Sequence, residues 1–254
     1  MSVVFVTAST ANTGFAIAEK FASEGYDVAV SSRDEQGAIK TAEYLKQKYS
    51  IKSKGYKLEL ANVENIKQVF RDIKTYFGSL DTFVANAANL GVGMDFLEVD
   101  EEEYAQVIDC NLKGTFFCAQ QAGLIMKEQN KGSIVFMSSV HSHECIFGRS
   151  LYTASKGGIN ALMRAIAIEL GKYNIRSNCI IAGAIKTNRW DNFTEEEIAR
   201  RRANWPIGLE STGEDIANDA FYLGSDLSKT VTGTELTIDS GILISLLPYK
   251  EGNK

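Results

Sequence analysis

Short apolar runs alternate along the chain with longer segments in which apolar residues recur every three or four positions. Seven of the short runs are rich in β-branched and aromatic residues and predict strands. They lie at residues 3–7, 27–31, 56–60, 81–85, 133–138, 175–181 and 234–238. Their near-continuous apolar character is typical of parallel strands buried on both faces. The longer segments predict helices, as the spacing of Ile159, Leu162, Ile166 and Leu170 illustrates.

This alternation predicts an α/β fold, in which one doubly wound, Rossmann-type domain spans residues 1–254. Its seven-stranded parallel sheet should carry helices on both faces. One irregular stretch, residues 186–212, interrupts the pattern between the sixth strand and the last helix. Its charged run EEEIARRRAN at 195–204 fits either a solvated helix or a segment that contacts substrate.

Composition narrows the functional classes. The chain has 254 residues, 44% of them hydrophobic and 23% charged, with a formal net charge of -5. An acidic chain lacks the basic surface with which proteins hold nucleic acid or anionic membranes, so neither partner is expected. No apolar run approaches the roughly 18 residues of a membrane span, and the first residues lack the basic start of a signal peptide, which favours the cytoplasm.

The cysteines indicate no metal site. They are scattered without a Cys-x-x-Cys pair, and only His141 and His143 could join them as ligands. We expect four reduced and mostly buried thiols, at Cys110, Cys118, Cys145 and Cys179.

The first strand leads directly into a loop and a helix, VTASTANTGFAIAEKF at residues 6–21. In parallel α/β sheets this is where a dinucleotide binds, because the helix N-terminus offers free N–H groups to the pyrophosphate. The Gly-x-Gly-x-x-Gly fingerprint is missing, although Gly14 stands at the helix start. Small polar residues fill the loop, namely Ser9, Thr10, Asn12 and Thr13. They could bind phosphate or simply cap the helix, and both interpretations stay open.

The strongest chemical signal lies in SSVHSHECIFGRSLYTASK, residues 138–156. Tyr152 and Lys156 are four apart at the start of a predicted helix, so the ammonium can lie near the phenol. A neighbouring cation favours the phenolate and adapts the tyrosine to acid–base work. Ser139 ends the preceding strand and could polarise a carbonyl. Asn111 is a further polar residue in an otherwise apolar helix.

This ordered set resembles the short-chain dehydrogenase/reductase family over nearly the whole chain. That family has an Asn on a long helix, a Ser at a strand end, a Tyr thirteen residues later and a Lys after three more, as at Asn111, Ser139, Tyr152 and Lys156. Further segments are similar to the family's Asn-Asn-Ala-Gly motif, its Pro-Gly-x-Ile-x-Thr motif and its C-terminal strand. They are ANAA at 85–88, AGAIKT at 182–187 and TGTELTIDSG at 232–241.

The sequence departs from the family pattern in the glycines of two motifs and the proline of a third. Ala8 and Asn12 replace the first two glycines of the phosphate loop, Ala88 replaces the last Gly of the second motif, and Ala182 replaces the Pro of the third. Alanine adds only one methyl group, and asparagine tolerates a left-handed backbone, so we expect the loop to function.

The resemblance implies reversible hydride transfer between a nicotinamide cofactor and a secondary alcohol or ketone. Tyr152 would move the proton, Ser139 would hydrogen-bond the substrate oxygen, and Lys156 would bind the nicotinamide ribose and lower the pKa of the tyrosine. Asn111 would hold a water that links this lysine to solvent. The residues expected at the cofactor are Thr7, Ser9, Asn12, Thr13, Gly14, Ser32, Arg33, Glu59, Leu60, Asn86, Ala87, Tyr152, Lys156, Gly183, Ile185 and Thr187.

The end of the second strand indicates which cofactor is used. A carboxylate there would accept a ribose hydroxyl of NAD, whereas a basic residue would accommodate the extra phosphate of NADP. Ser31 and Ser32 are followed by Arg33, and Asp34 comes only after it, where it can cap the next helix. We therefore favour NADP over NAD.

The family's substrate loop follows the sixth strand, so we expect a lid within 186–212, mainly 188–206. The residues expected to contact substrate are Ser139, His141, Tyr152 and Trp190. The Ser-Val-His run resembles that of sugar and polyol dehydrogenases, which favours a polar substrate. Hydroxysteroids or other apolar ketones are an alternative, since tryptophans also suit apolar rings. A catalytically silent, cofactor-binding or scaffolding homologue is the alternative of another class.

The resemblance also implies a homotetramer formed through the Tyr-Lys helix and the C-terminal strand. The apolar segment GILISLLPY at 241–249 is consistent with burial at such an interface.

Overall fold

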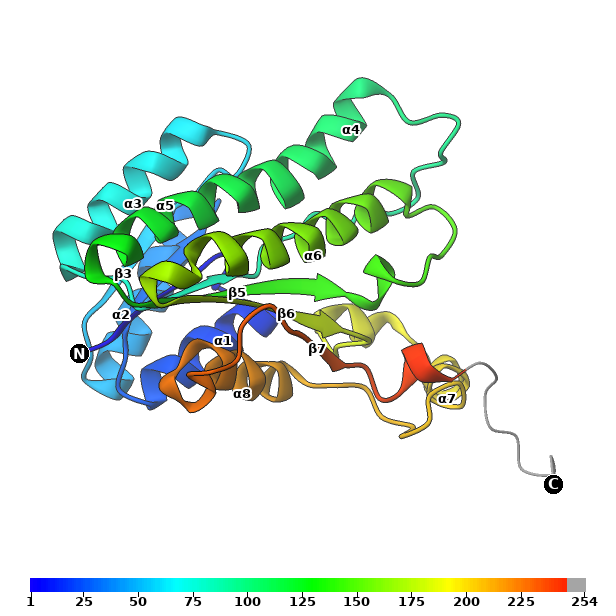
Figure 1. The fold of residues 1–254 in the computed structure, drawn as a ribbon. Coiled ribbons are helices and arrows are strands. Elements are labelled where there is room, and N and C mark those ends of the chain that lie inside the picture. The colour runs from blue at the N-terminus through cyan, green and yellow to red at the C-terminus, as the bar shows by residue number, and fades with distance from the viewer. Residues whose placement is uncertain (246–254) are drawn as a thin grey trace.

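Seven parallel strands form one sheet in the order β3-β2-β1-β4-β5-β6-β7 (Figure 1). The computed structural model describes residues 1–245. The strands are β1 (Val3–Val6), β2 (Asp27–Ser32), β3 (Ser53–Lys57), β4 (Thr82–Ala85), β5 (Gly132–Ser139), β6 (Ile175–Ala182) and β7 (Glu235–Ile238). The predicted doubly wound parallel fold is confirmed, and the chain reverses its winding direction between β1 and β4.

Eight α-helices accompany the sheet in the described residues. They are α1 (Asn12–Ser23), α2 (Glu35–Tyr49), α3 (Val63–Phe77), α4 (Glu101–Ile108), α5 (Gly114–Gln129), α6 (Ser150–Leu170), α7 (Glu195–Arg202) and α8 (Gly213–Gly224). Helices α3, α5 and α6 cover one face of the sheet, and α1, α2 and α8 cover the other (Figure 1). None of the described helices is long and apolar enough to cross a membrane.

Side-chain alternation along the central strand explains the two layers. Phe5 of β1 belongs to the core shared with α3 and α5, whereas its neighbours Val4 and Val6 belong to the core shared with α1 and α8. All three are fully buried. Because successive strand residues point to opposite faces, an unbroken apolar run is what a strand with two covered faces requires.

The predicted position of the third strand is wrong by three residues. The apolar run at 56–60 suggested it, but β3 spans Ser53–Lys57 and pairs only with β2 at the sheet edge. A β-carbon added to Gly55 would lie 2.3 Å from the carbonyl carbon of Ala38, so the strand lies directly against the backbone of α2. This close approach, rather than an apolar run, fixes the position of β3. Glu59 and Leu60 therefore follow the end of the strand and are not part of it.

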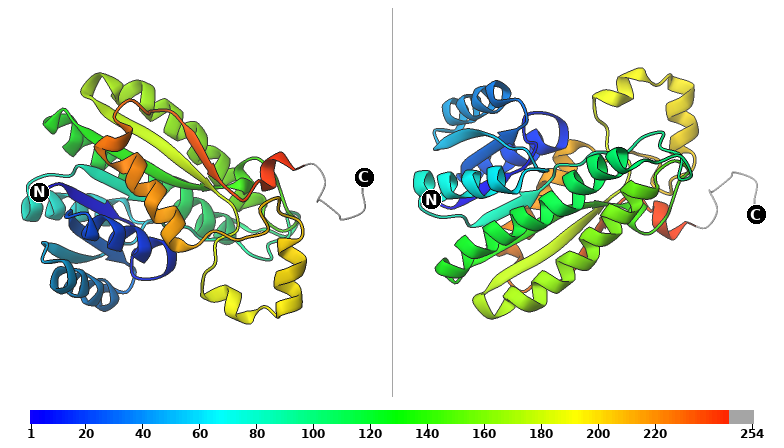
Figure 2. Two further views of the ribbon diagram at one scale, coloured as in Figure 1. Left: turned by 90° about the horizontal axis from the view of Figure 1, so that it is seen from below. Right: turned by 90° about the horizontal axis from the view of Figure 1, so that it is seen from above.

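The stretch predicted to be irregular contains ordered helices. A 3-10 turn at Asn188–Asn192 precedes α7, and α7 buries none of its residues. Thr194 caps α7 reciprocally with Glu197, and Arg202 binds Glu210 through two hydrogen bonds of 2.8 and 2.6 Å. Figure 2 shows this segment projecting beside the sheet as a separate lobe. We call residues 186–212 the lid.

Candidate active site

A cavity of about 430 Å³ opens at the carboxyl edge of the sheet, where the loops after β1, β4, β5 and β6 meet. Ligands of open parallel sheets bind at such an edge, beside the point where the winding reverses. The walls are formed by the phosphate loop, the loop after β4, the start of α6 and the first residues of the lid. The lining residues are Ala8, Thr10, Ala11, Asn12, Thr13, Gly14, Asn86, Ala87, Ala88, Leu90, Met137, Ser138, Ser139, Tyr152, Lys156, Ala182, Gly183, Ile185, Thr187 and Arg189.

Ser139, Tyr152 and Lys156 lie together in this cavity. Ser139 ends β5, and the other two stand one turn apart on the first turns of α6. Tyr152 is 7% exposed and Lys156 is 2% exposed. The Lys156 ammonium lies 5.5 Å from the centre of the Tyr152 ring and donates a hydrogen bond of 2.7 Å to the Met137 carbonyl. The three predicted groups are therefore placed for acid–base chemistry at one point.

The charge state of Tyr152 differs from the expectation. Burial raises the pKa of the phenol, and this effect outweighs the hydrogen bond from Ser139 and the positive charges of Arg149 and Arg189, which lower the pKa. Burial also lowers the pKa of Lys156, to about 8. The sequence predicted that Lys156 would draw Tyr152 toward the phenolate. In this structure desolvation wins instead, and the phenol keeps its proton at neutral pH.

Asn111 lies outside the cavity, fully buried in a π-helical turn at Asp109–Lys113. Its Nδ2 donates to the Asn89 carbonyl at 2.8 Å and to the Ser155 hydroxyl at 3.1 Å, while its Oδ1 accepts the Asn89 N–H at 2.6 Å. Ser155 in turn donates to the Tyr152 carbonyl at 2.7 Å. Asn111 thus ties the loop after β4 to the turn that carries Tyr152. The sequence analysis missed Asn89 and Ser155, although Ser155 stands three residues from the tyrosine.

The phosphate loop keeps a left-handed backbone without its glycines. Ala8 and Asn12 have φ angles of 51 and 49°. Gly14 cannot be replaced easily, because a β-carbon there would lie 2.1 Å from the Ala8 carbonyl oxygen. Ala11 precedes α1 and supplies no capping hydrogen bond, and the first turn holds no acidic residue. Of the two interpretations, the capped helix is excluded, and the free N–H groups suit an anion.

Two residues predicted to bind the cofactor, Thr7 and Ser9, instead hold the phosphate loop against its neighbouring strands and loop. The Ser9 hydroxyl donates to the Val6 carbonyl at 2.8 Å and accepts the Ser31 N–H at 3.0 Å. The Thr7 hydroxyl accepts the N–H groups of Asn86 and Ala87 at 2.9 and 3.0 Å. Both side chains are buried and outside the cavity lining. The expectation that Ser9 binds the cofactor directly is corrected, because its hydroxyl is used to hold β1 to β2.

The remaining predicted cofactor residues fall into two groups. Those in the cavity lining are Asn12, Thr13, Gly14, Asn86, Ala87, Gly183, Ile185 and Thr187. Those outside it are Ser32, Arg33, Glu59 and Leu60. The Thr187 hydroxyl is buried without a hydrogen-bond partner among the described residues. An orphaned hydroxyl beside an uncapped helix and a buried ammonium fits a dinucleotide with phosphate and ribose groups.

The end of β2 carries no free carboxylate. Asp34 is a helix cap, since its Oδ1 accepts the Gln36 N–H at 3.1 Å and its own N–H donates to the Ser32 hydroxyl at 3.1 Å. Arg33 is exposed and forms no ion pair with the described residues. Glu59 donates its N–H to Asn65 and lies 3.9 Å from Lys57. This distribution leaves Arg33 as the free charged group beside the strand end.

His141 and Trp190, two residues expected to contact the substrate, lie in different surroundings. The His141 ring meets the Tyr152 ring edge to face at 6.1 Å, but His141 is not among the cavity-lining residues and its Nδ1 lies 3.2 Å from the Glu144 carbonyl. Trp190 is buried within the lid, where its Nε1 donates to the Ile185 carbonyl and its ring lies 6.1 Å from that of Trp205. Trp190 is not among the cavity-lining residues, so the geometry gives it a packing task and not the predicted substrate contact. Arg189, which the sequence analysis missed, lines the cavity instead.

The cysteines are free thiols, two of them buried, at Cys118 and Cys179. Cys110 is partly buried, whereas Cys145 is exposed, so the expectation of buried thiols fails at this position. Among residues 1–245, no group of three or more His, Cys, Asp or Glu residues could hold a metal ion.

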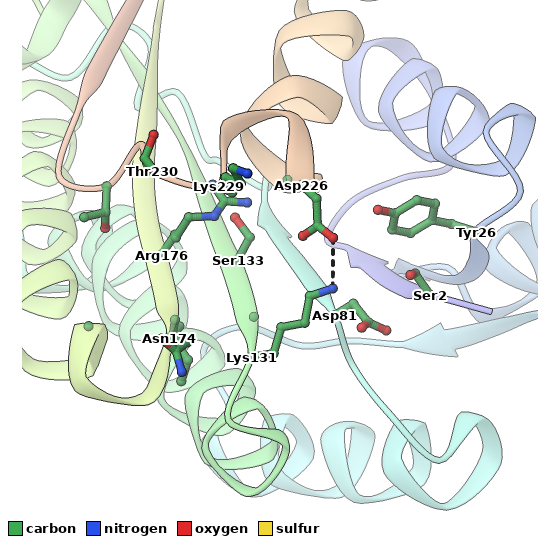
Figure 3. A pocket seen from close by; sticks show the side chains of 15 residues that line it. Ser2, Tyr26, Asp81, Lys131, Ser133, Asn174, Arg176, Asp226, Lys229 and Thr230 are labelled. Carbon is green, nitrogen blue, oxygen red and sulfur yellow. Dashed lines mark hydrogen bonds and ion pairs between the residues drawn. The ribbon is translucent and has the colours of Figure 1, made fainter.

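A second cavity, of about 320 Å³, lies at the amino ends of the strands, and Ser139, Tyr152 and Lys156 do not line it. Figure 3 shows Lys131 reaching Asp226 there, at 3.2 Å. The Arg176 guanidinium donates to the carbonyls of Leu223 and Ser225 at 2.7 and 2.8 Å, at the C-terminal end of α8. A cation at this end complements the helix dipole, so the side chain stabilises the fold.

Comparisons with known proteins find relatives over nearly the whole chain. Residues 7–243 match the profile of the family described as enoyl-(acyl carrier protein) reductase. A Yarrowia lipolytica protein assigned as an NADP-dependent mannitol dehydrogenase is 32% identical over 242 residues, which cover 94% of this chain and 86% of the relative. The 3alpha-hydroxysteroid dehydrogenase of Mediterraneibacter gnavus is 33% identical over 241 residues, covering 93% and 95%.

A solved structure has the same fold. It is assigned as a short-chain alcohol dehydrogenase from Sinorhizobium meliloti 1021, is 32% identical, and superposes with a TM-score of 0.90 over 96% of this chain and 97% of the other.

Proposed function

The chain belongs to the short-chain dehydrogenase/reductase family, and we propose that it transfers a hydride between NADP(H) and the carbonyl carbon of a sugar, polyol or similar polar compound. Relatives in this family support the coarser statement, an oxidoreductase that acts on CH–OH and C=O groups and uses a nicotinamide cofactor. The observation that carries the proposal is the meeting of Ser139, Tyr152 and Lys156 in one cavity with an uncapped helix N-terminus.

The side chains divide the work between them. In the direction of reduction, Tyr152 donates its phenolic proton to the substrate oxygen, which suits a phenol whose pKa burial keeps high. The Ser139 hydroxyl orients the same oxygen by a hydrogen bond. The nicotinamide supplies or accepts the hydride when it is bound. Lys156 would hold the ribose hydroxyls with its buried ammonium, and Asn111 holds the turn of Tyr152 through Ser155. The amide of Asn111 is occupied by Asn89 and Ser155, so the predicted water between Lys156 and solvent is not part of the proposal.

NADP is the proposed cofactor because of the charges at the end of β2. Asp34 is occupied as a cap, and Arg33 is free to meet the extra phosphate of NADP. The Yarrowia relative, assigned as NADP-dependent, supports the same choice.

We take a polar substrate as the first candidate, because the His141 ring lies beside that of Tyr152 just outside the cavity lining and, among the described residues, only its Nδ1 is bonded, to the Glu144 carbonyl. Apolar ketones such as hydroxysteroids are the second candidate. It is favoured by the bacterial hydroxysteroid dehydrogenase relative and by Phe96 and Phe147, which are 76% and 93% exposed and line a separate cavity with Arg149. We further propose a cytoplasmic homotetramer.

Replacing Tyr152 with Phe tests the activity. We expect Tyr152→Phe to lose about a thousandfold or more in turnover, because the proton donor is gone. Binding of NADPH, followed by its fluorescence, should stay within about twofold of the wild type, since the ring remains. Near-normal turnover by this variant would refute the role of Tyr152. A wild-type protein that binds no reduced cofactor at millimolar concentration would support the silent homologue instead.

Replacing Arg33 with Ala tests the cofactor. We expect the wild type to have a higher kcat/KM with NADPH than with NADH. Arg33→Ala should lower kcat/KM with NADPH by about tenfold and leave the value with NADH unchanged, because only NADPH carries the extra phosphate. A wild type that prefers NADH overturns the choice of NADP.

A further inference from the structure

Two arginines act on Tyr152, Arg189 from the lining of the cavity and Arg149 from a separate, adjoining hollow. Arg189 extends from the lid and lines the cavity itself. Arg149 directly precedes α6 and donates a hydrogen bond of 2.6 Å to the carbonyl of Leu90, which lines the same cavity. The two side chains therefore approach Tyr152 from different elements, one from the lid and one from the wall beside the loop after β4.

Neither arginine is neutralised by a carboxylate of residues 1–245. The ion pairs of the described residues include Arg202 with Glu210 and Arg164 with Glu235, but none that involves Arg149 or Arg189. Elsewhere on the lid, Arg201 lies over the Phe193 ring at 4.1 Å. Arg189 forms no hydrogen bond with any described residue, so its guanidinium has all its donors free.

The positive charges of Arg149 and Arg189 both act on the Tyr152 phenol. Together with the hydrogen bond from Ser139, they are what lowers the pKa of the Tyr152 phenol against the effect of burial. In a chain that carries 32 acidic and 27 basic side chains, two unpaired arginines beside one phenol create a local positive field. A guanidinium presents its N–H groups in a planar fork that matches the oxygens of carboxylates and phosphates.

We propose that the substrate carries an anionic group, a carboxylate or a phosphate, which Arg189 binds and Arg149 attracts while the neighbouring carbonyl faces Tyr152. This inference rests on the proposed function. The reaction balances as an ordinary carbonyl reduction, in which the carbon gains a hydride and the oxygen gains the Tyr152 proton. The nicotinamide is oxidised, and the phenolate recovers a proton from solvent.

Matched substrates test the proposal. One pair is a short-chain keto acid and its primary amide, and a second pair is a ketose phosphate and the free ketose. The wild type should favour the anionic member of one pair by about tenfold or more in kcat/KM. The pair that shows the preference distinguishes a carboxylate site from a phosphate site.

Variants locate the anion site. Arg189→Leu should lower kcat/KM for the preferred anion by about tenfold, mainly through KM, and leave the neutral partner within about twofold. Arg189→Lys should recover part of the loss, because it restores the charge without the fork. Arg200→Leu, on the exposed surface of α7, is the control for a lost lid charge and should behave as the wild type.

The outcomes separate this inference from the proposed function. If the enzyme turns over neutral and anionic substrates equally, or if Arg189→Leu weakens both members of a pair alike, the anion site is wrong and the reductase activity stands. If Arg189→Leu changes only the dissociation constant of NADPH, Arg189 serves the cofactor and the inference is wrong. If no substrate is turned over and NADPH does not bind, both the inference and the proposed function fall.

Discussion

At the scale of single residues, the site depends on how burial shifts the pKa values of two neighbouring groups. Tyr152 and Lys156 are both almost fully buried, and desolvation pushes their pKa values in opposite directions. The phenol is raised and stays protonated, whereas the ammonium is lowered to about 8 and can lose its proton under mildly alkaline conditions. The lysine is therefore the first of the two to change its charge as the pH rises.

This order of titration predicts how cofactor binding depends on pH. In the proposed complex the protonated ammonium of Lys156 donates to the ribose hydroxyls, so the affinity for NADPH should fall as the pH rises through about 8. Below that pH the charged form dominates and the affinity should level off. Fluorescence titration between pH 6.5 and about 9.5 measures this dependence.

Lys156→Met provides the comparison for that titration. It removes the titrating group, so the affinity of this variant for NADPH should be weaker and free of the step near pH 8. A wild type whose affinity is the same at about pH 7 and pH 9 would contradict the assigned pKa.

Residue spacing predicted that Ser139, Tyr152 and Lys156 lie together, because β5, a short connection and α6 follow one another along the chain. Local geometry then fixes their distances. Arg189 could not be predicted in this way, since its approach to the cavity depends on how the lid folds back. The role of Ser9 could not be predicted for a related reason. A loop serine can hold two strands together or bind a ligand, and only its contact with Ser31 shows that it holds the strands.

At the scale of elements, the phosphate loop depends on one glycine and not on three. Gly14 lies against the Ala8 carbonyl with no room for a β-carbon, whereas Ala8 and Asn12 adopt the left-handed backbone themselves. Asn12 also accepts the Asn188 N–H at 3.3 Å, so the loop touches the lid through a side chain that glycine lacks.

Three variants separate these contributions. Gly14→Ala should weaken NADPH binding by about tenfold or more, roughly 1.4 kcal/mol, because the added methyl displaces the Ala8 backbone. Ala8→Gly and Asn12→Gly should bind within about twofold of the wild type, since glycine adopts a left-handed backbone without strain. If Asn12→Gly loses as much as Gly14→Ala, the Asn12 amide itself binds the cofactor.

The sequence pattern predicted β1, β2, β4, β5 and β6 because burial on both faces leaves an unbroken apolar run. It also predicted β7, which is only partly buried. It misplaced only β3, the edge strand, whose position depends on Gly55 meeting the backbone of α2. The helices of the lid were left undecided, since α7 buries no apolar face and leaves no periodic signal.

At the scale of the whole molecule, the surface of the Tyr-Lys helix bears on assembly. Ile168 on α6 is 84% exposed, and Leu124 on the neighbouring α5 is 53% exposed. Apolar side chains gathered on one helical layer are typical of protein interfaces. The apolar segment 241–249 that the sequence analysis also assigned to an interface lies partly outside the described residues.

We expect the protein to sediment as a tetramer. Ile168→Glu should shift it to a smaller species, because the substitution would place a carboxylate in an apolar contact. Leu227→Glu, a change of equal chemistry at a side chain that is 69% exposed in the turn after α8, should leave the assembly intact. A wild-type protein that sediments as a monomer would rule out the tetramer.

The reversal of winding between β1 and β4 also governs how the chain can fold. The Val3 N–H bonds to the carboxylate of Asp81, 78 positions away, and Val4 pairs with Thr82. Joining such distant segments requires a large loss of chain entropy before any contact is gained, which slows folding. During synthesis, β1 can gain this partner only after the β4 segment has left the ribosome. The phosphate loop is held in place by Thr7, whose hydroxyl accepts hydrogen bonds from the two residues that follow β4. The proposed cofactor site is therefore completed late in folding.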